Sequence, residues 1–179
     1  MILISAGHFP ERPGVCFGSF CEHGEACTWA INIVENLISL GQDAELVPSG
    51  VLKEKIEFIN SINPLFAVEI HFNSYNILSD VDLVGGSRSL YLPGSEIGAL
   101  LASNIQIELA KAFKPDLGIC EGWYRGNTKR GADYFLDKTE CTSVIIEPEF
   151  IHRKATIERN RSEACLNISK AILKTKSEL

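Results

Sequence analysis

The chain has 179 residues, of which 45% are hydrophobic, so it can bury a core of the size expected for one globular domain. Its 17 basic and 23 acidic residues give a formal net charge of -6. This acidic balance disfavours a nucleic acid or an anionic membrane as a partner held by bulk electrostatics. No run reaches the roughly 18 apolar residues of a membrane span, and no segment resembles a linker or a repeat. We therefore expect a single domain over residues 1–179.

The N-terminal segment and the cysteines indicate the compartment. Met1 leads directly into an apolar, strand-like segment, without the charged region and cleavage site of an export signal. We therefore expect synthesis in a cytoplasm and reduced thiols, most of them acting as small buried hydrophobes. A structural zinc knot is an alternative for one crowded segment, although that segment has no C-x-x-C pair; its members are Cys16, Cys21, His23 and Cys27. The remaining cysteines are Cys120, Cys141 and Cys165.

Short apolar segments alternate with helical patterns along the chain. The segments that predict strands are 2–6, 44–47, 65–71, 89–92 and 143–147. Helical spacing of apolar residues predicts helices over 24–40, 51–62, 96–113 and 155–174. Helix boundaries are indicated by Ser95 as an N-cap, and by Gly41, Asn63-Pro64 and Pro115 as stops. This alternation predicts one α/β domain, with a central mixed, mostly parallel sheet of about six strands flanked by helices.

Four residues suited to a hydrolytic zinc centre fall at the carboxyl ends of expected strands or at the start of a helix. In an open α/β sheet these ends line one crevice, so residues far apart in sequence can meet there. His8 follows the first strand and comes directly after Gly7, which allows a sharp turn. His71 ends the third expected strand. Glu147 ends an apolar strand, where an ionisable group must be solvated, paired or protonated. Glu25 begins the first helix.

The choice of Glu25 over its neighbours depends on its place in the helix. Acidic residues at a helix start also favour the helix dipole with no further purpose. Glu22 is equally acidic, but Glu25 lies nearer the helix proper and is adjacent to Gly24. Glu22 and His23 remain the alternatives for this position.

Two further carboxylates lie close to the expected site. Glu69 precedes His71 by two residues and so shares its face of the strand. It could orient the imidazole, or it could pair with a lysine elsewhere. Glu149 follows Pro148, and we expect it to be solvated or to cap a helix; it is the alternative to Glu147 as a base.

Two neutral imidazoles and one carboxylate form a ligand set for Zn²⁺ that leaves one coordination position open for water. The metal would lower the pKa of that water toward about 7 and polarise a scissile carbonyl, while Glu147 would carry the proton to the leaving nitrogen. These residues therefore predict amide hydrolysis without a covalent intermediate. A nucleophilic cysteine is the rival mechanism, but no cysteine lies in a recognisable Cys-His arrangement by sequence.

These residues and their surroundings resemble the zinc-dependent N-acetylmuramoyl-L-alanine amidases (amidase type 3) of bacterial cell-wall enzymes and phage endolysins. The resemblance covers nearly the whole chain and includes Ile4-Ser5-Ala6-Gly7-His8, Pro13-Gly14-Val15, Ile70-His71-Phe72-Asn73 and 144–151. It implies zinc ligands at His8, Glu25 and His71 and a catalytic glutamate at Glu147. It implies hydrolysis of the amide between N-acetylmuramic acid and L-alanine in peptidoglycan. The chain departs from the family at Glu149, where a glycine is usual, and at Glu69, where a serine is frequent.

Recognition of peptidoglycan or a muropeptide is expected to involve two segments. One segment combines polar and aromatic residues, namely Trp123, Tyr124, Arg125, Asn127 and Lys129. Its arginine could form a bidentate pair with a carboxylate of the substrate. Arg125 is the preferred substrate contact there, and Asn73 is a second candidate.

The sequence is also compatible with other functions. No separate wall-binding module is visible, which suits a compact phage lysin that acts on the wall after release, or a cytoplasmic enzyme that recycles muropeptides. A zinc carboxypeptidase or another amidohydrolase on a similar sheet is one alternative. A metal-dependent cell-wall-binding domain without catalysis is another.

Overall fold

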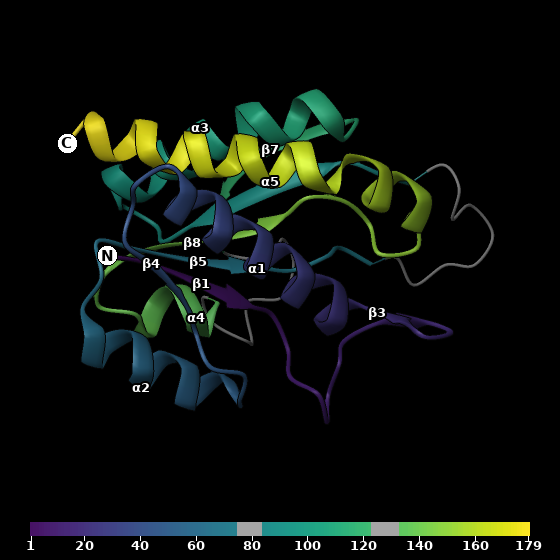
Figure 1. Cartoon of the computed structure of the whole chain (residues 1–179), viewed down its shortest axis with the longest axis horizontal. Coiled ribbons are helices and arrows are strands. Elements are labelled where there is room, and N and C mark those ends of the chain that lie inside the picture. Colours follow the sequence, from purple (N-terminus) through teal and green to yellow (C-terminus); the bar gives the residue numbers. More distant parts are fainter. Residues whose placement is uncertain (75–83, 123–132) are drawn as a thin grey trace.

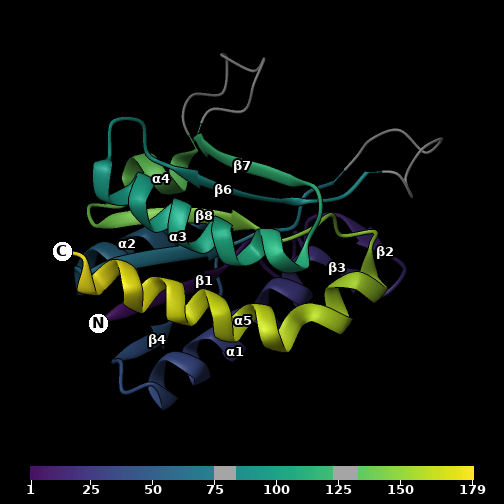
Figure 2. The same ribbon diagram turned by 90° about the horizontal axis from the view of Figure 1, so that it is seen from above.

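A computed structural model describes residues 1–74, 84–122 and 133–179 of the chain. Its main sheet contains β1 (Ile2–Ala6), β4 (Ala44–Leu46), β5 (Phe66–Ile70), β6 (Ser87–Tyr91), β7 (Asp116–Glu121) and β8 (Thr142–Glu147). The strand order is β4-β1-β5-β8-β6-β7. The first four are parallel, β6 is antiparallel to β8, and β7 runs parallel to β6 (Figure 2). The predicted mixed, mostly parallel sheet of about six strands is confirmed.

Helices cover both faces of this sheet (Figure 1). One face carries α1 (Glu22–Ser39), α3 (Glu96–Ala112) and α5 (Lys154–Ser177); the other carries α2 (Leu52–Ile62) and α4 (Tyr134–Lys138). Alternation along the strands divides the apolar residues between the two layers. In β5, for example, Phe66 and Val68 pack with Trp29 of α1, whereas Ala67 packs on the side of Ile59 in α2. Within the described ranges, no helix is long and apolar enough to cross a membrane.

Several boundaries follow the predicted signals. The side chain of Ser95 accepts a hydrogen bond from the backbone N of Gly98 at 3.0 Å and so caps α3. Gly41, just beyond α1, has a φ of 79°, and Asn63 ends α2 in the left-handed region. The sequence patterns missed β7 and α4. The strand β7 lies at the sheet edge and is partly exposed, so it lacks an apolar run, and α4 has only 5 residues.

A small hairpin precedes α1 and corrects the prediction of six reduced thiols. It consists of β2 (Cys16–Phe17) and β3 (Phe20–Cys21), and a disulfide joins Cys16 to Cys21. The two cysteines lie directly opposite each other in the antiparallel pair, which brings their Cα atoms within reach of a disulfide. The prediction was wrong for this pair, because sequence spacing alone does not reveal the hairpin. The disulfide also uses two of the residues proposed for a zinc knot.

Within the described residues, the other four cysteines form no disulfide: Cys27, Cys120, Cys141 and Cys165. Burial raises the pKa of Cys141 to about 11 and raises the pKa of Cys165 as well. These two thiols therefore stay protonated at neutral pH. Cys165 is buried as a small hydrophobe, as expected, but Cys27, Cys120 and Cys141 are only partly buried, so the expectation that most of the cysteines are buried was wrong.

Candidate metal and catalytic site

The carboxyl ends of three neighbouring parallel strands form one edge of the sheet. His8 follows β1, His71 follows β5, and Glu147 is the last residue of β8. The strands end in register, and the backbone N of His71 donates to the carbonyl O of Ile146 at 2.9 Å. The parallel register therefore brings residues that are 139 positions apart in sequence, 8 to 147, to one edge of the molecule.

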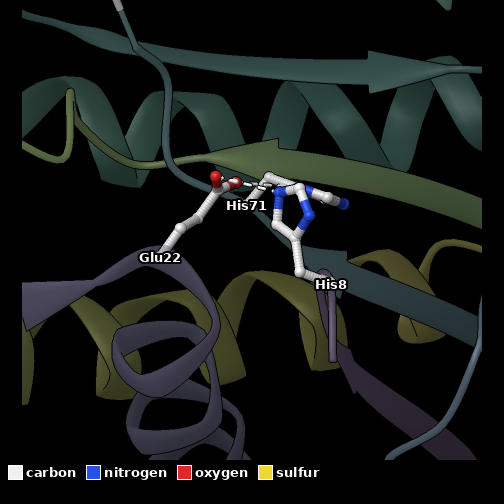
Figure 3. A group of neighbouring side chains, drawn as sticks. All are labelled: His8, Glu22 and His71. Carbon is white, nitrogen blue, oxygen red and sulfur yellow. Dashed lines mark hydrogen bonds and ion pairs between the residues drawn. The ribbon is translucent and has the colours of Figure 1, made fainter. Parts of the chain in front are cut away.

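His8, Glu22 and His71 point toward one another at this edge (Figure 3). One carboxylate oxygen of Glu22 lies 2.9 Å from Nε2 of His8, and the other lies 3.0 Å from Nδ1 of His71. The second oxygen also accepts a hydrogen bond from the backbone N of Phe72 at 3.1 Å. Two imidazole nitrogens and a carboxylate oxygen thus lie within 4.8 Å of one another, which is the spacing of a group that could hold a metal ion.

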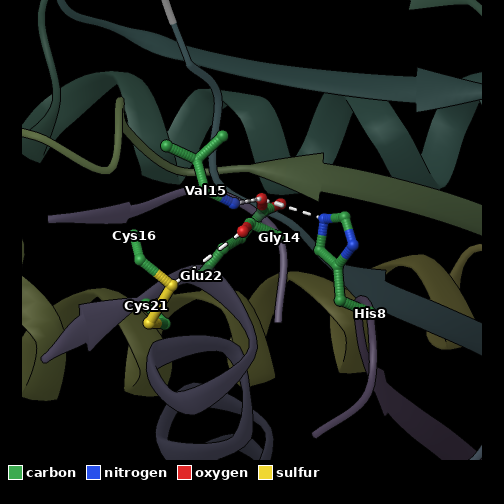
Figure 4. Close-up of a disulfide and its surroundings, with 6 residues drawn as sticks. All are labelled: His8, Gly14, Val15, Cys16, Cys21 and Glu22. Atoms are coloured by element: carbon green, nitrogen blue, oxygen red, sulfur yellow. Dashed lines mark hydrogen bonds and ion pairs between the residues drawn. A yellow bond between two sulfur atoms is a disulfide. The ribbon is translucent and has the colours of Figure 1, made fainter. Parts of the chain in front are cut away.

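The disulfide-linked hairpin delivers Glu22 to this group (Figure 4). Cys21 is the N-cap of α1, so Glu22 is the first residue of the helix. The backbone N of Glu22 donates to the carbonyl O of Val15 at 3.0 Å, and the Val15 backbone N donates back to the Glu22 carboxylate at 3.4 Å. A side chain at Gly14 would collide with this carboxylate and would lie 2.7 Å from Cδ2 of His8. The glycine therefore permits the close approach of the turn to both residues.

Glu25, expected from the sequence to complete the ligand set, does not belong to this group. Its carboxylate accepts hydrogen bonds from Nε of Arg161 at 2.7 Å and from Nη2 of Arg161 at 2.9 Å, and from Nε1 of Trp29 at 2.9 Å. It therefore joins α1 to α5 rather than facing the histidines. A signal for this placement was present, because Glu25, Trp29 and Ile33 follow one another at four-residue spacing on the buried stripe of α1. The structure brings the alternative, Glu22, to the histidines instead.

His23, the other alternative, also faces away from the group. Its Nδ1 lies 2.8 Å from the carbonyl O of Gly7, and its Nε2 lies 3.5 Å from Sγ of Cys27. The sequence did not reveal this Cys-His pair, which depends on one helical turn. Burial raises the pKa of the Cys27 thiol, and the nearby charge of Lys55 offsets this only in part. A protonated thiol is a poor nucleophile, so the pair does not favour the cysteine mechanism.

His8 itself makes the turn off β1, whereas the sequence had suggested Gly7. His8 has a φ of 59°, in the left-handed region that residues other than glycine seldom adopt. Gly7 has another function, because an added Cβ would lie 2.5 Å from Cε1 of His71. The absence of a side chain at Gly7 makes space for the second imidazole.

Buried charges control protonation within the group when no metal is bound. Burial alone would raise the pKa of Glu22, but hydrogen bonds from His71 and His8 outweigh it and lower this pKa to about 2. Burial alone would lower the pKa of His71, but Glu22 and Glu69 outweigh it and raise this pKa to about 10. The metal-free site is therefore a carboxylate paired with an imidazolium.

Glu147 lies in the same part of the structure but outside the group of three. It is 3% exposed, and strand alternation places it on the face of Ile145, which packs toward α2 and α4. Asp133, the N-cap of α4, lies near it: burial and then the charge of Glu147 raise the pKa of Asp133 to about 6. No sequence pattern points to Asp133, which follows a long segment without a strand or helix pattern.

The remaining candidates have diverse placements. Glu149 is fully buried, and its carboxylate accepts from the backbone N of Gly86 at 2.7 Å and from Nη1 of Arg153 at 2.9 Å. Its expected solvated role is therefore wrong. Asn73 lies beyond the end of β5 and forms a backbone bridge with Phe150, which lies beyond the end of β8. Arg125 and its neighbours Trp123, Tyr124, Asn127 and Lys129 lie outside the described residues.

Several solved structures, among them two described as amidases, are similar to the fold of this chain. The CwlD amidase from Clostridioides difficile, solved in complex with the GerS lipoprotein, matches with a TM-score of 0.83 at 20% identity over 99% of this chain and 98% of that one. The amidase AmiC2 of Nostoc punctiforme matches with a TM-score of 0.82 at 19% identity over 98% and 96% of the two chains. Cwp6 from Clostridium difficile matches with a TM-score of 0.78 at 20% identity over 99% of this chain, which spans only 28% of Cwp6.

The family assignment comes from the sequence. No curated protein matches the chain. The family model described as N-acetylmuramoyl-L-alanine amidase, in contrast, matches residues 2–175, which include the whole sheet and each residue of the site. The chain belongs to the N-acetylmuramoyl-L-alanine amidase family.

Proposed function

We propose that the chain hydrolyses the amide bond between N-acetylmuramic acid and L-alanine of peptidoglycan with one zinc ion bound by His8, Glu22 and His71. The observation that carries this proposal is the convergence of two imidazole nitrogens and one carboxylate within 4.8 Å. This donor set fits a catalytic zinc, which takes three protein ligands and keeps a position open. The family membership supplies the substrate class.

The donor atoms of both histidines face the Glu22 carboxylate, and the His71 ring is also held from behind. Glu69 binds Nε2 of His71 at 3.1 Å, which leaves Nδ1 to face Glu22. Nε2 of His8 faces the other Glu22 oxygen at 2.9 Å. When bound, zinc would polarise the scissile carbonyl and lower the pKa of a water molecule to about 7.

Glu147 is the general base in this proposal. It ends the strand next to His71 and is not a member of the group of three. Its carboxylate would take a proton from the attacking water and hand it to the leaving nitrogen of L-alanine. Asn73 and Arg125 are proposed as contacts to the stem peptide or glycan, which would hold the scissile bond beside this carboxylate.

Product analysis tests the proposal directly. Purified protein should contain one zinc per chain, lose activity to a chelator and regain it when zinc is added. Mass spectrometry of digested muropeptides should then show free stem peptides with an L-alanine amino terminus and intact glycan. Release of a single C-terminal amino acid would indicate a carboxypeptidase instead. Binding to sacculi without any product would indicate a wall-binding domain.

A further inference from the structure

A pair of buried charges lies directly behind the two histidines. Lys55 belongs to α2 and Glu69 belongs to β5, and each side chain is only 3% exposed. Their charged atoms are 3.8 Å apart. Burying two charges carries a large desolvation cost, and an apolar pair of the same volume is often equally stable at such a position. Stability alone therefore does not explain this pair.

Lys55 holds the turn that carries His8. Its Nζ donates to the carbonyl O of Ala6 and, at 2.7 Å, to the carbonyl O of His8. These two carbonyls flank the step from β1 into the left-handed conformation of His8, whose φ is 59°. Such a conformation persists only where its surroundings enforce it. By drawing both carbonyls to one cation, Lys55 fixes the direction in which the His8 ring leaves the strand.

Glu69 holds the second imidazole. One of its oxygens lies 3.1 Å from Nε2 of His71, and the other accepts a hydrogen bond from Oγ of Ser5 at 2.8 Å. A carboxylate on one ring nitrogen of a histidine fixes the orientation of the ring and directs the other nitrogen outward. Here that other nitrogen, Nδ1, lies 3.0 Å from Glu22.

We propose that Lys55 and Glu69 form a positioning pair that holds both histidines in the arrangement required to bind zinc. The inference rests on the proposed zinc-dependent function and adds two residues to it. Neither residue belongs to the group that could hold the ion. Lys55 contacts the backbone around His8, and Glu69 contacts the His71 ring and Ser5 of β1, so the ion pair and the Ser5 hydrogen bond join the two histidine-bearing strands.

Zinc affinity and unfolding, measured separately on the full chain, test this pair. The variants are Lys55→Met, Glu69→Met and the double variant, titrated with zinc against a chelating dye and unfolded in urea without metal. Each single variant should weaken zinc binding about 10–100-fold, the usual effect of losing a partner of a metal-binding histidine. Each should also lower the urea midpoint, because it leaves one buried charge uncompensated.

The double variant separates positioning from stability. Removing both charges should restore much of the urea midpoint, while zinc binding stays at least tenfold weaker than in the wild type. Glu69→Gln keeps an oxygen for the His71 ring and should bind zinc more tightly than Glu69→Met. Lys53→Met is the matched control. Lys53 also forms an ion pair on α2, but its side chain is 76% exposed, so the zinc affinity of this variant should equal that of the wild type.

Two results would overturn the inference in different ways. Wild-type zinc affinity in the double variant would mean that the pair serves stability alone. No stoichiometric zinc in the wild-type protein would instead overturn the proposed function, and the positioning pair with it.

Discussion

Two carboxylates in the first turn of α1 have different surroundings three residues apart. Glu22 faces the carboxyl ends of β1 and β5, where it contacts His8 and His71. Glu25 faces the contact between α1 and α5, where it meets Arg161 and Trp29. Both are almost fully buried and both carry charged hydrogen bonds. The chemistry open to each is therefore set by the segment that packs against it, and not by residue type or by position near the helix start.

The same contrast recurs at the end of β8. Glu147 lies at the strand edge, beside the histidine segment and near Asp133. Glu149, two residues later, is enclosed by backbone N–H groups and Arg153. One carboxylate of each pair is thus a proposed ligand or base, and the other holds segments together. Substitutions at the two kinds of position should therefore have separable effects.

The largest expected change is the loss of turnover in Glu147→Gln. The amide keeps the shape of the side chain but cannot accept a proton, so turnover should fall about 10²–10⁴-fold while zinc stays bound. Turnover is measured on muropeptides and zinc by elemental analysis. Glu149→Gln is the matched control, and it should lower stability rather than the rate of the folded enzyme. Near wild-type turnover in Glu147→Gln would remove this residue from the mechanism.

A second comparison uses Glu22→Ala and Glu25→Ala. Loss of Glu22 removes one of three proposed ligands, so zinc binding should weaken by more than the roughly 10–100-fold typical of an indirect contact. Glu25→Ala should retain one zinc per chain, because its carboxylate is held by Arg161. The measurement is zinc content after dialysis, followed by dye competition. The reverse pattern would return the third ligand to Glu25.

The third prediction concerns stability at the contact between α1 and α5. Glu25→Ala leaves Arg161, whose side chain is 23% exposed, without its carboxylate, and the free energy of unfolding should fall by about 3 kcal/mol. Glu158 forms an exposed ion pair with Lys154 on α5, the helix that carries Arg161. Glu158→Ala should therefore lower the free energy of unfolding by less than about 0.5 kcal/mol. Urea unfolding of both variants measures the difference. Equal losses would mean that the Glu25 contact is no more than a surface pair.

The smallest effect is the release of about one proton when zinc binds. The pKa of His71 is raised to about 10 in the metal-free site, so the ring is protonated at pH 7 and must lose that proton to bind a metal through Nδ1. Apparent zinc affinity should therefore rise with pH across the neutral range. Calorimetry in buffers of different ionisation enthalpy counts the proton. Binding without proton release would contradict the paired imidazolium.

Much of the fold could be predicted because its signals are local. Apolar segments such as 2–6 and 143–147, helical spacing, and the cap at Ser95 depend on residues close in sequence. The parallel sheet then implies that His8, His71 and the end of β8 share one edge. The amidase resemblance, carried by segments around these residues, agrees with the family match over residues 2–175.

Only the tertiary structure decided which neighbours each buried group would have. Glu22 rather than Glu25 meets the histidines because the hairpin starts α1 two residues earlier than the pattern predicts, and because α5 supplies Arg161 from 136 residues away. The disulfide between Cys16 and Cys21 depends on the antiparallel register of that same hairpin. Lys55 and Glu69 meet only because α2 packs on the face of the sheet that carries Ala67 and Glu69 of β5. Such contacts join distant segments, and their energies depend on burial and geometry, which a linear pattern does not contain.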